Sequence, residues 1–243
     1  MASDHASATD RLAGPEIDWR PVPRPQRTVL EGRHVRVRPL DALADADALH
    51  AESHPPAGDP DLWTYMPSGP YRDVAEYREA LVVDQRSEDP LFFTLLRLPD
   101  EGPAGIASYL RITPEHGSIE IGHIWFGASL RRSTAATEAI YLLAAHAFDE
   151  LGYRRLEWKC NALNQASRRA AERFGFAFEG VFRHHMVVKD RNRDTAWYAI
   201  TDDEWPAVGD AFKTWLSPES FDEAGRQRRR LGELTAGARG SVR

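Results

Sequence analysis

The stretch Ile121-Gly-His-Ile-Trp-Phe-Gly-Ala-Ser-Leu-Arg-Arg-Ser-Thr-Ala-Ala-Thr-Glu138 decides the predicted fold. It begins as the end of a strand, passes through a loop that contains Arg131 and Arg132, and enters a helix whose first turn holds only small residues. The first N–H groups of a helix have no partner within the helix, and the helix dipole places partial positive charge there. The junction therefore predicts either an anion-binding site or an ordinary capped helix.

Upstream of this junction, the sequence has the pattern of an antiparallel meander. Three strands, separated by turns that contain Pro and Gly, are predicted at residues 91–97, 105–112 and 118–126. Before them, the spacing predicts a strand at 34–38 and helices at 41–51 and 74–86.

Downstream, a strongly amphipathic helix is predicted over 134–151, with Gly152 as its C-terminal stop. A strand at 155–160, a short helix capped by Asn164 and ending near 174, and strands at 176–188 and 195–200 follow. The element order β-α-α-β-β-β-α-β-α-β-β indicates an α+β fold whose sheet is only partly parallel.

The two ends of the chain differ from this body. We expect residues 1–27 to be extended or disordered, because they lack apolar periodicity and alternate prolines occupy part of them. Residues 217–243 are predicted to form a charged tail in which one short helix fits. The remaining 28–216 have the size of one domain.

Composition excludes several classes of protein. The chain has 243 residues, a formal net charge of −6 and a single cysteine, Cys160. This charge argues against a general nucleic-acid binder, which needs a basic surface. One cysteine allows neither an internal disulfide nor a thiolate zinc cluster. No apolar stretch approaches the ~20 residues of a membrane span, and no secretory signal begins the chain, so we expect a cytoplasmic protein.

The common catalytic motifs are absent. The sequence contains no His-Glu-x-x-His, Gly-x-Ser-x-Gly, phosphate-loop or dinucleotide-binding pattern. The adjacent His184 and His185 are expected on opposite faces of a strand, so they cannot share one ion. We therefore predict no metal site, and we expect Cys160 to be a core residue.

A long segment between the two predicted upstream helices is too rich in Pro and Gly for regular structure. Connections of this length are often functional, and this one carries four side chains that we expect to form an apolar substrate wall or, alternatively, to plug the core: Trp63, Tyr65, Met66 and Tyr71.

Several motifs together resemble the GNAT superfamily of acyltransferases, in its RimJ/RimL-like branch. Arg131-Arg-Ser-Thr-Ala-Ala136 stands where that family has its Arg/Gln-x-x-Gly-x-Gly/Ala loop. Glu120-Ile-Gly-His-Ile-Trp125 resembles the family's central strand. The next block is represented by Asn164-Gln-Ala-Ser167, Arg173-Phe-Gly-Phe176 and Glu179-Gly-Val-Phe-Arg183. The resemblance covers about residues 30–200 and implies a single domain with a mixed, mostly antiparallel central sheet flanked by helices on both faces.

The resemblance implies that acetyl-coenzyme A is the acyl donor and that a primary amine, on a protein N-terminus or a small molecule, is the acceptor. The pyrophosphate would lie on the loop before the long helix. The pantetheine arm would lie along the end of the central strand, in a gap where two neighbouring strands splay apart. A β-bulge there would supply a backbone N–H as an oxyanion donor. The residues implied are Trp125, Phe126, Gly127, Arg131, Arg132, Ser133, Thr134, Ala135, Ala136, Thr137 and Asn164. Thr134 departs from the pattern, because the family has glycine there, so altered coenzyme binding is one consequence.

The chemistry implied is direct attack by a neutral amine on the thioester in a ternary complex, and it needs a base. Glu120 and His123 are the candidates, and in a regular strand they would face opposite sides, so at most one would line the cleft. The resemblance favours Glu120. It also implies Ser167 as the group that protonates the leaving thiolate, because the tyrosine used by many family members is missing.

Other interpretations stay open at this point. A non-catalytic module that binds coenzyme A fits Thr134 and the missing tyrosine, and an interaction protein whose Arg-rich ends recruit an acidic partner fits the termini. An open sheet edge makes a homodimer an expectation as well.

Overall fold

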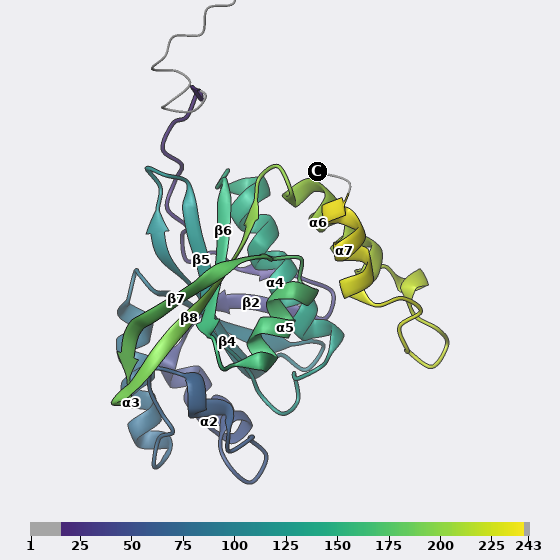
Figure 1. Ribbon diagram of the computed structural model, residues 1–243. Helices are drawn as coiled ribbons and strands as arrows, with labels where there is room; N and C mark the ends of the chain where they lie inside the picture. The colour runs from purple at the N-terminus through teal and green to yellow at the C-terminus, as the bar shows by residue number, and fades with distance from the viewer. Residues whose placement is uncertain (1–15, 241–243) are drawn as a thin grey trace, which may run out of the picture.

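The computed structural model describes residues 16–240, and one eight-stranded sheet runs through it in the order β1-β2-β3-β4-β5-β6-β8-β7 (Figure 1). The strands are β1 (Leu30–Glu31), β2 (Val35–Pro39), β3 (Leu91–Arg97), β4 (Gly102–Thr113), β5 (Ser118–Phe126), β6 (Arg155–Asn161), β7 (Ala177–Val188) and β8 (Arg191–Thr201). Neighbouring strands are antiparallel except β5 and β6, which are parallel. The predicted mixed, mostly antiparallel sheet is therefore confirmed.

Six α-helices cover this sheet in the described part of the chain: α2 (Ala42–Ser53), α3 (Val74–Arg86), α4 (Thr134–Ala145), α5 (Gln165–Arg173), α6 (Trp205–Leu216) and α7 (Leu231–Gly240). The side chains of α2 and α3 pack with Phe92, Ile106 and Trp125 on one face. The side chains of α4, α5 and α6 share a second core with Phe93 and other residues of the opposite face. Phe92 and Phe93 point to opposite faces because strand side chains alternate, so helices flank both faces as predicted.

The long predicted helix is interrupted near its end. α4 stops at Ala145, and a single π-helical turn, His146–Glu150, continues it to the expected stop near Gly152. The expected irregular loop before α3 also contains a short 3₁₀ turn, Leu62–Tyr65.

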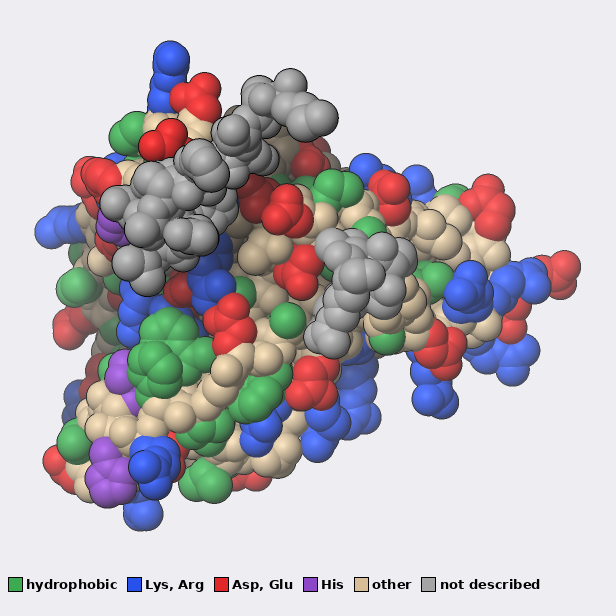
Figure 2. Space-filling model, turned by 45° about the horizontal axis from the view of Figure 1, so that its top comes forward, with side chains coloured by type: hydrophobic (Ala, Val, Ile, Leu, Met, Phe, Trp, Pro, Cys, Tyr) green, Lys and Arg blue, Asp and Glu red, His purple; other side chains and the backbone are tan. Residues whose placement is uncertain are grey.

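The helix α6 was missed by the sequence analysis, which left residues 201–216 without an element. The signal was present, because Val208, Phe212 and Trp215 have helical spacing and are buried. The segment beyond residue 216 contains α7, whose Leu231 is buried against the second core. Figure 2 shows that side chains of both charges lie over this projecting C-terminal part, at the right of the view.

At the other end, residues 16–27 contain no helix or strand. They lie along the turn between β4 and β5, where Trp19 Nε1 donates to the carbonyl of Glu115 at 2.8 Å and the amide of Val22 donates to that of Pro114 at 3.2 Å. The rest of the predicted extended segment, residues 1–15, lies outside the described residues. Within residues 16–240, no helix has the length and apolar character needed to cross a bilayer.

One buried carboxylate fixes α4 to the edge of the sheet. Glu138 accepts hydrogen bonds from three consecutive amides in the turn into β2: Arg33 at 3.0 Å, His34 at 2.6 Å and Val35 at 3.1 Å. Hydrogen bonds to a charged acceptor are stronger than neutral ones, and the side chain is only 6% exposed. The orientation of the helix that follows the Arg131 loop therefore depends on Glu138.

We predict that Glu138→Ala lowers the free energy of unfolding by about 3 kcal/mol, because three amides lose a charged acceptor. Urea unfolding followed by circular dichroism measures this. The control is Glu79→Ala on the exposed face of α3, for which we expect a change below about 0.5 kcal/mol. Equal, small changes in both variants would contradict the anchoring role of Glu138.

Candidate functional site

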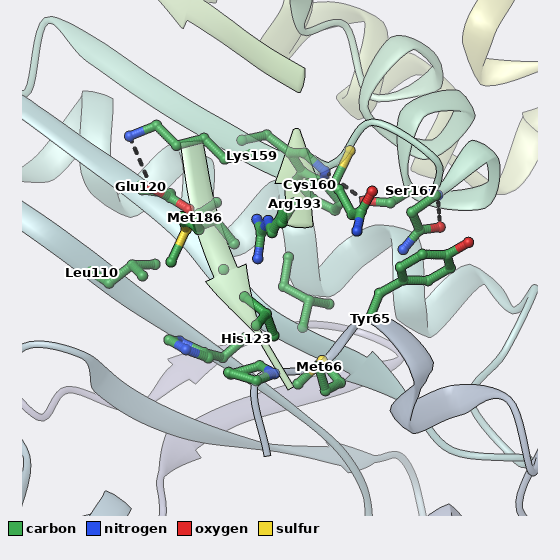
Figure 3. A pocket seen from close by; sticks show the side chains of 18 of the residues that line it. Tyr65, Met66, Leu110, Glu120, His123, Lys159, Cys160, Ser167, Met186 and Arg193 are labelled. Carbon is green, nitrogen blue, oxygen red and sulfur yellow. Dashed lines mark hydrogen bonds and ion pairs between the residues drawn. The ribbon is translucent and has the colours of Figure 1, made fainter. Parts of the chain in front are cut away.

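The site begins where β5 and β6 separate. The two strands pair only at Ser118–Arg155, Ile119–Leu156 and Glu120–Glu157, and no pair follows. Beyond these pairs a cavity of about 250 Å³ opens between them, as the resemblance implies (Figure 3). Its lining residues include Glu120, His123, Asn164 and Ser167, together with Tyr65 and Met66 from the loop before α3.

A β-bulge in β5 brings Glu120 and His123 into the same cavity. Ile106 pairs with Trp125 and Ser108 with Gly122, so both His123 and Ile124 stand opposite the single residue Ala107. His123 has a left-handed backbone, with φ of 47°. The expectation that at most one of the two candidates lines the cleft is therefore wrong, because the extra residue breaks the alternation on which it rested. The resemblance implies a bulge at the end of the strand, near Trp125–Gly127. The observed bulge lies slightly earlier, at His123 and Ile124.

Among the described residues, His123 has a hydrogen-bond partner at only one ring nitrogen, Nδ1. Ser108 Oγ donates to the carbonyl of Gly122 at 3.0 Å, so its lone pairs are left to accept from His123 Nδ1 at 3.2 Å. This arrangement puts the proton on Nδ1 and leaves Nε2 as an acceptor. Burial lowers the pKa of His123 below its ordinary 6.5, and the charges of Arg111 and Arg193 lower the pKa further. The imidazole is thus neutral near pH 7.

Glu120 is instead bound by two cations. Its Oε2 atom accepts from Arg111 at 2.7 Å and lies 3.1 Å from Lys159 Nζ, and the side chain is 4% exposed. Burial raises the pKa of Glu120, while the charges of Lys159 and Arg111 oppose that rise. Lys159 also contacts Glu157 at 2.5 Å, and its ammonium lies 3.8 Å from the ring centre of Trp197. Glu120 therefore belongs to an ion-pair network in the wall of the cavity.

Ser167 faces the opposite wall, one turn into α5. Its hydroxyl accepts a hydrogen bond from Trp158 Nε1 at 3.0 Å, and the same side chain hydrogen-bonds to Cys160. Asn164 caps the helix, with its side-chain oxygen 3.0 Å from the amide of Ser167. Cys160 is buried beside them, and burial raises the pKa of its thiol, which makes it a poor nucleophile.

The loop before α4 lies outside this cavity and has the geometry of an anion site. Ser133 caps the helix by accepting from the amide of Ala136 at 3.1 Å, which leaves the first-turn amides of Thr134 and Ala135 for another acceptor. Arg131 pairs with Asp59 at 2.6 Å, whereas Arg132 is exposed, with a φ of 57°. Thr137 is buried and accepts from Arg173 at 3.0 Å. These donors fit a phosphate at the start of the helix.

The end of the central strand faces a second cavity, of about 320 Å³, on the α2–α3 side of the sheet. Trp125 lines it together with the predicted wall residues Trp63 and Tyr71, whereas Phe126 and Gly127 do not. Gly127 packs instead beside Glu52, since a Cβ there would come within 2.6 Å of the Glu52 side chain. Three residues line both cavities: Met66, Pro67 and His123. His123 therefore stands at the boundary between the two spaces.

The β7–β8 hairpin closes the site from the third side. Phe182 pairs with Thr195 and Met186 with Arg193, so three residues of β7 stand opposite Asp194 alone. The Asp194 carboxylate accepts from the amide of His184, which has a φ of 51°, at 2.7 Å. The bend turns Met186 and Arg193 toward the first cavity.

The tip of this hairpin is tied to the loop before α3. Lys189 Nζ donates to the carbonyls of Trp63 at 2.8 Å, Gly69 at 2.7 Å and Ser68 at 3.3 Å. Gly69 has a φ of 69°, and a Cβ there would come within 2.5 Å of the Trp63 ring, so this turn needs glycine. Hairpin and loop together form one continuous wall.

Several residues of the site escaped the sequence analysis. Arg111 and Arg193 lie at irregularities that strand alternation does not reveal, and Lys159 looks like an ordinary strand lysine. Among the residues that the structure describes, no group of three or more His, Cys, Asp or Glu side chains could hold a metal ion. His184 and His185 lie in the bend of β7, so simple alternation does not describe them.

Comparison with known proteins agrees with this geometry. A family model described as "Acetyltransferase (GNAT) domain" matches residues 34–177, more than half of the chain. The crystal structure of a GCN5-related N-acetyltransferase from Brucella melitensis has a TM-score of 0.86 and 46% identity, covering 90% of this chain and 99% of that one. A Bacillus subtilis (strain 168) protein named "Putative ribosomal N-acetyltransferase YdaF" is 27% identical over 145 residues, which are 59% of this chain and 78% of that protein.

A more distant structure shares the fold. It is an acetyl transferase from Salmonella typhimurium, described as modifying the N-terminal serine of 50S ribosomal subunit protein L7/L12. Its TM-score is 0.61 at 21% identity, over 72% of this chain and 99% of that one.

We predict that Lys189→Met loosens the loop before α3 without unfolding the domain. Loss of the charged donor is expected to speed amide exchange at Met66 and Tyr71 by about tenfold, or about 1.4 kcal/mol of local stability. Hydrogen exchange measures this, with Arg191→Ala on the same hairpin as the control. Unchanged protection of both amides would show that Lys189 does not hold the loop.

Proposed function

The chain belongs to the GNAT family of N-acetyltransferases, and on that premise we propose that it transfers an acetyl group from acetyl-coenzyme A to a primary amine within a ternary complex. One observation carries the proposal: His123 lines both cavities, so it can reach a donor in one and an acceptor in the other. The relatives found are consistent with the RimJ/RimL-like branch.

The residues present fit acetyl-coenzyme A, which supplies the activated acetyl group. We propose that the amides of Thr134 and Ala135 and the guanidinium of Arg132 hold its pyrophosphate. With threonine in place of the family's glycine, the amides of Thr134 and Ala135 are still not capped by Ser133, whose side chain accepts only from the amide of Ala136. The gap between β5 and β6, with Asn164 beside it, would take the pantetheine arm.

His123 is the base that the contacts favour. Its Nε2 atom has no hydrogen-bond partner among residues 16–240, burial keeps the ring neutral, and the side chain lines the second cavity. Glu120, which the family resemblance favours, has its Oε2 atom held by two cations. We therefore propose that His123 accepts the amine proton and that Glu120 organises Arg111 and Lys159.

Two further groups would serve the reacting thioester. Ser167 would turn its hydroxyl proton from Cys160 to the departing sulfur, since Trp158 already donates to its oxygen. The bulge at His123 and Ile124 supplies backbone N–H groups for the developing negative charge on the carbonyl oxygen. Both groups lie along the gap between β5 and β6.

The acceptor would enter on the α2–α3 side, between the walls formed by Trp63, Met66 and Tyr71, whereas Tyr65 lines the first cavity. The name of YdaF raises ribosomal proteins as acceptors, alongside small amines. We also retain a cytoplasmic location and a homodimer as proposals, the latter because β7 is an edge strand with Phe178 and Phe182 exposed. A coenzyme-binding module without activity is not favoured, because the relatives found are named as N-acetyltransferases.

We predict that His123→Gln lowers kcat by about 100-fold, a typical contribution of a general base, with a change in the Kd of acetyl-coenzyme A below about twofold. In the wild type, protonation of His123 removes the base, so kcat falls only as pH drops below about 6.5, the ordinary pKa of histidine. A thiol reagent that detects released coenzyme A measures the rates. If Glu120→Gln costs that much and His123→Gln costs nothing, Glu120 is the base.

We also predict that Arg132→Ala weakens acetyl-coenzyme A by about tenfold, or about 1.4 kcal/mol, through loss of a phosphate contact. Isothermal titration calorimetry measures this Kd. S-Acetylpantetheine, which lacks the pyrophosphate and the nucleotide, is the matched ligand, and the variant is expected to bind it like the wild type. An equal loss for both ligands would contradict a phosphate contact.

A further inference from the structure

The second cavity contains a carboxylate on the side of a helix that faces the core. Tyr77, Leu81 and Asp84 follow one another at positions i, i+4 and i+7 of α3, so they share one face. All three line the cavity, and the first two are almost completely buried. An acidic residue in this row is costly for stability unless it has a partner.

Asp84 has no such partner in the described part of the chain. No hydrogen bond or ion pair to its carboxylate is present among residues 16–240, and burial raises its pKa to about 6. Tyr77 is a second unsatisfied polar side chain, since its hydroxyl is buried without a hydrogen bond and the side chain is only 2% exposed. Burial raises the pKa values of Tyr71 and Tyr77, the charge of Asp84 raises both further, and all three side chains line the same cavity.

The remaining walls are aromatic. The five aromatic side chains that line the cavity are Trp63, Tyr71, Tyr77, Phe92 and Trp125. Trp63 lies edge-on to Tyr71, with ring centres 5.4 Å apart, and Tyr71 lies 4.9 Å from Tyr77. Aromatic faces attract organic cations, and the attraction grows when water is excluded. Asp84 is the only carboxylate among the lining residues, and they include no lysine or arginine.

From these observations we infer that the acceptor carries a second positive charge, which Asp84 and the aromatic walls bind while its primary amine meets His123. The inference rests on the proposed function, since it names the substrate class of the same site. Asp84 and His123 both line this cavity, so one molecule can contact both. The second charge would be the other ammonium of a small diamine, or a Lys side chain close to the N-terminus of a peptide.

The test compares amines that differ only in that charge. 1,5-Diaminopentane is paired with pentylamine, and the peptide Ser-Lys-Ala-Ala with Ser-Gln-Ala-Ala. Thiol release gives kcat/KM for each, in the wild type, in Asp84→Asn and in the control Glu79→Gln, which changes an exposed acid on the same helix.

We expect the wild type to prefer the dicationic member of at least one pair by about tenfold or more, the effect of one well-placed charge pair. Asp84→Asn should bring that ratio close to one, mainly through KM, whereas Glu79→Gln should keep it. The pair that shows the preference identifies the source of the charge. Equal kcat/KM within both pairs, or a preference that survives in Asp84→Asn, would overturn the inference.

A binding measurement separates this inference from the proposed function, because it tests the cation site even when no acetyl transfer is detected. Titration of 1,5-diaminopentane, followed by the intrinsic tryptophan fluorescence to which Trp63 and Trp125 contribute, should give a Kd that Asp84→Asn raises about tenfold. Binding of this kind without thiol release for any amine would refute acetyl transfer and support the cation site. Thiol release with no difference between paired amines, and no diamine binding, would refute the cation site alone. Thermal melting checks that Asp84→Asn is folded.

Discussion

The short parallel pairing between β5 and β6 is the constraint on which the rest of the site depends. Three residue pairs hold the two strands together, and beyond them the strands diverge around a cavity. In the last pair, the Glu120 and Glu157 carboxylates lie side by side where little water reaches them, so they would repel each other. Lys159 lies between them and Arg111 approaches from β4, so opposite charges stabilise the point where the pairing ends.

Irregular strand backbone then decides which side chains reach the site. Arg111, His123 and His184 all have left-handed backbone angles, with φ of 48°, 47° and 51°, and each lies where a strand departs from regular pairing. Carboxylates hold two of these bends: Asp89 accepts from the amides of Arg111 and Ile112, and Asp194 accepts from that of His184. Regular strands would send these side chains elsewhere. The irregularities at Arg111 and His123, and the bend at His184 that turns Arg193 inward, therefore bring side chains to the lining of the first cavity.

The fold was largely predictable, because apolar periodicity and turn residues mark most of its elements. Residues 74–86, 91–97 and 118–126 have the bounds expected for α3, β3 and β5, and Asn164 caps α5 as predicted. The details of the site were less predictable. Period-two alternation cannot show that His123 and Glu120 share a cavity, nor that Arg193 turns inward. Asp84 could have been found from the sequence, because it is an acidic residue on the same helix face as the apolar Tyr77 and Leu81.

The central claim is that the gap between β5 and β6 delivers the thioester to His123, which stands at the boundary of the donor and acceptor cavities. A crystal structure of the protein with coenzyme A tests this most directly. The account predicts the pyrophosphate on the amides of Thr134 and Ala135, and the sulfur between Ser167 and His123. A coenzyme that lies outside the gap, with its sulfur remote from His123, would contradict it.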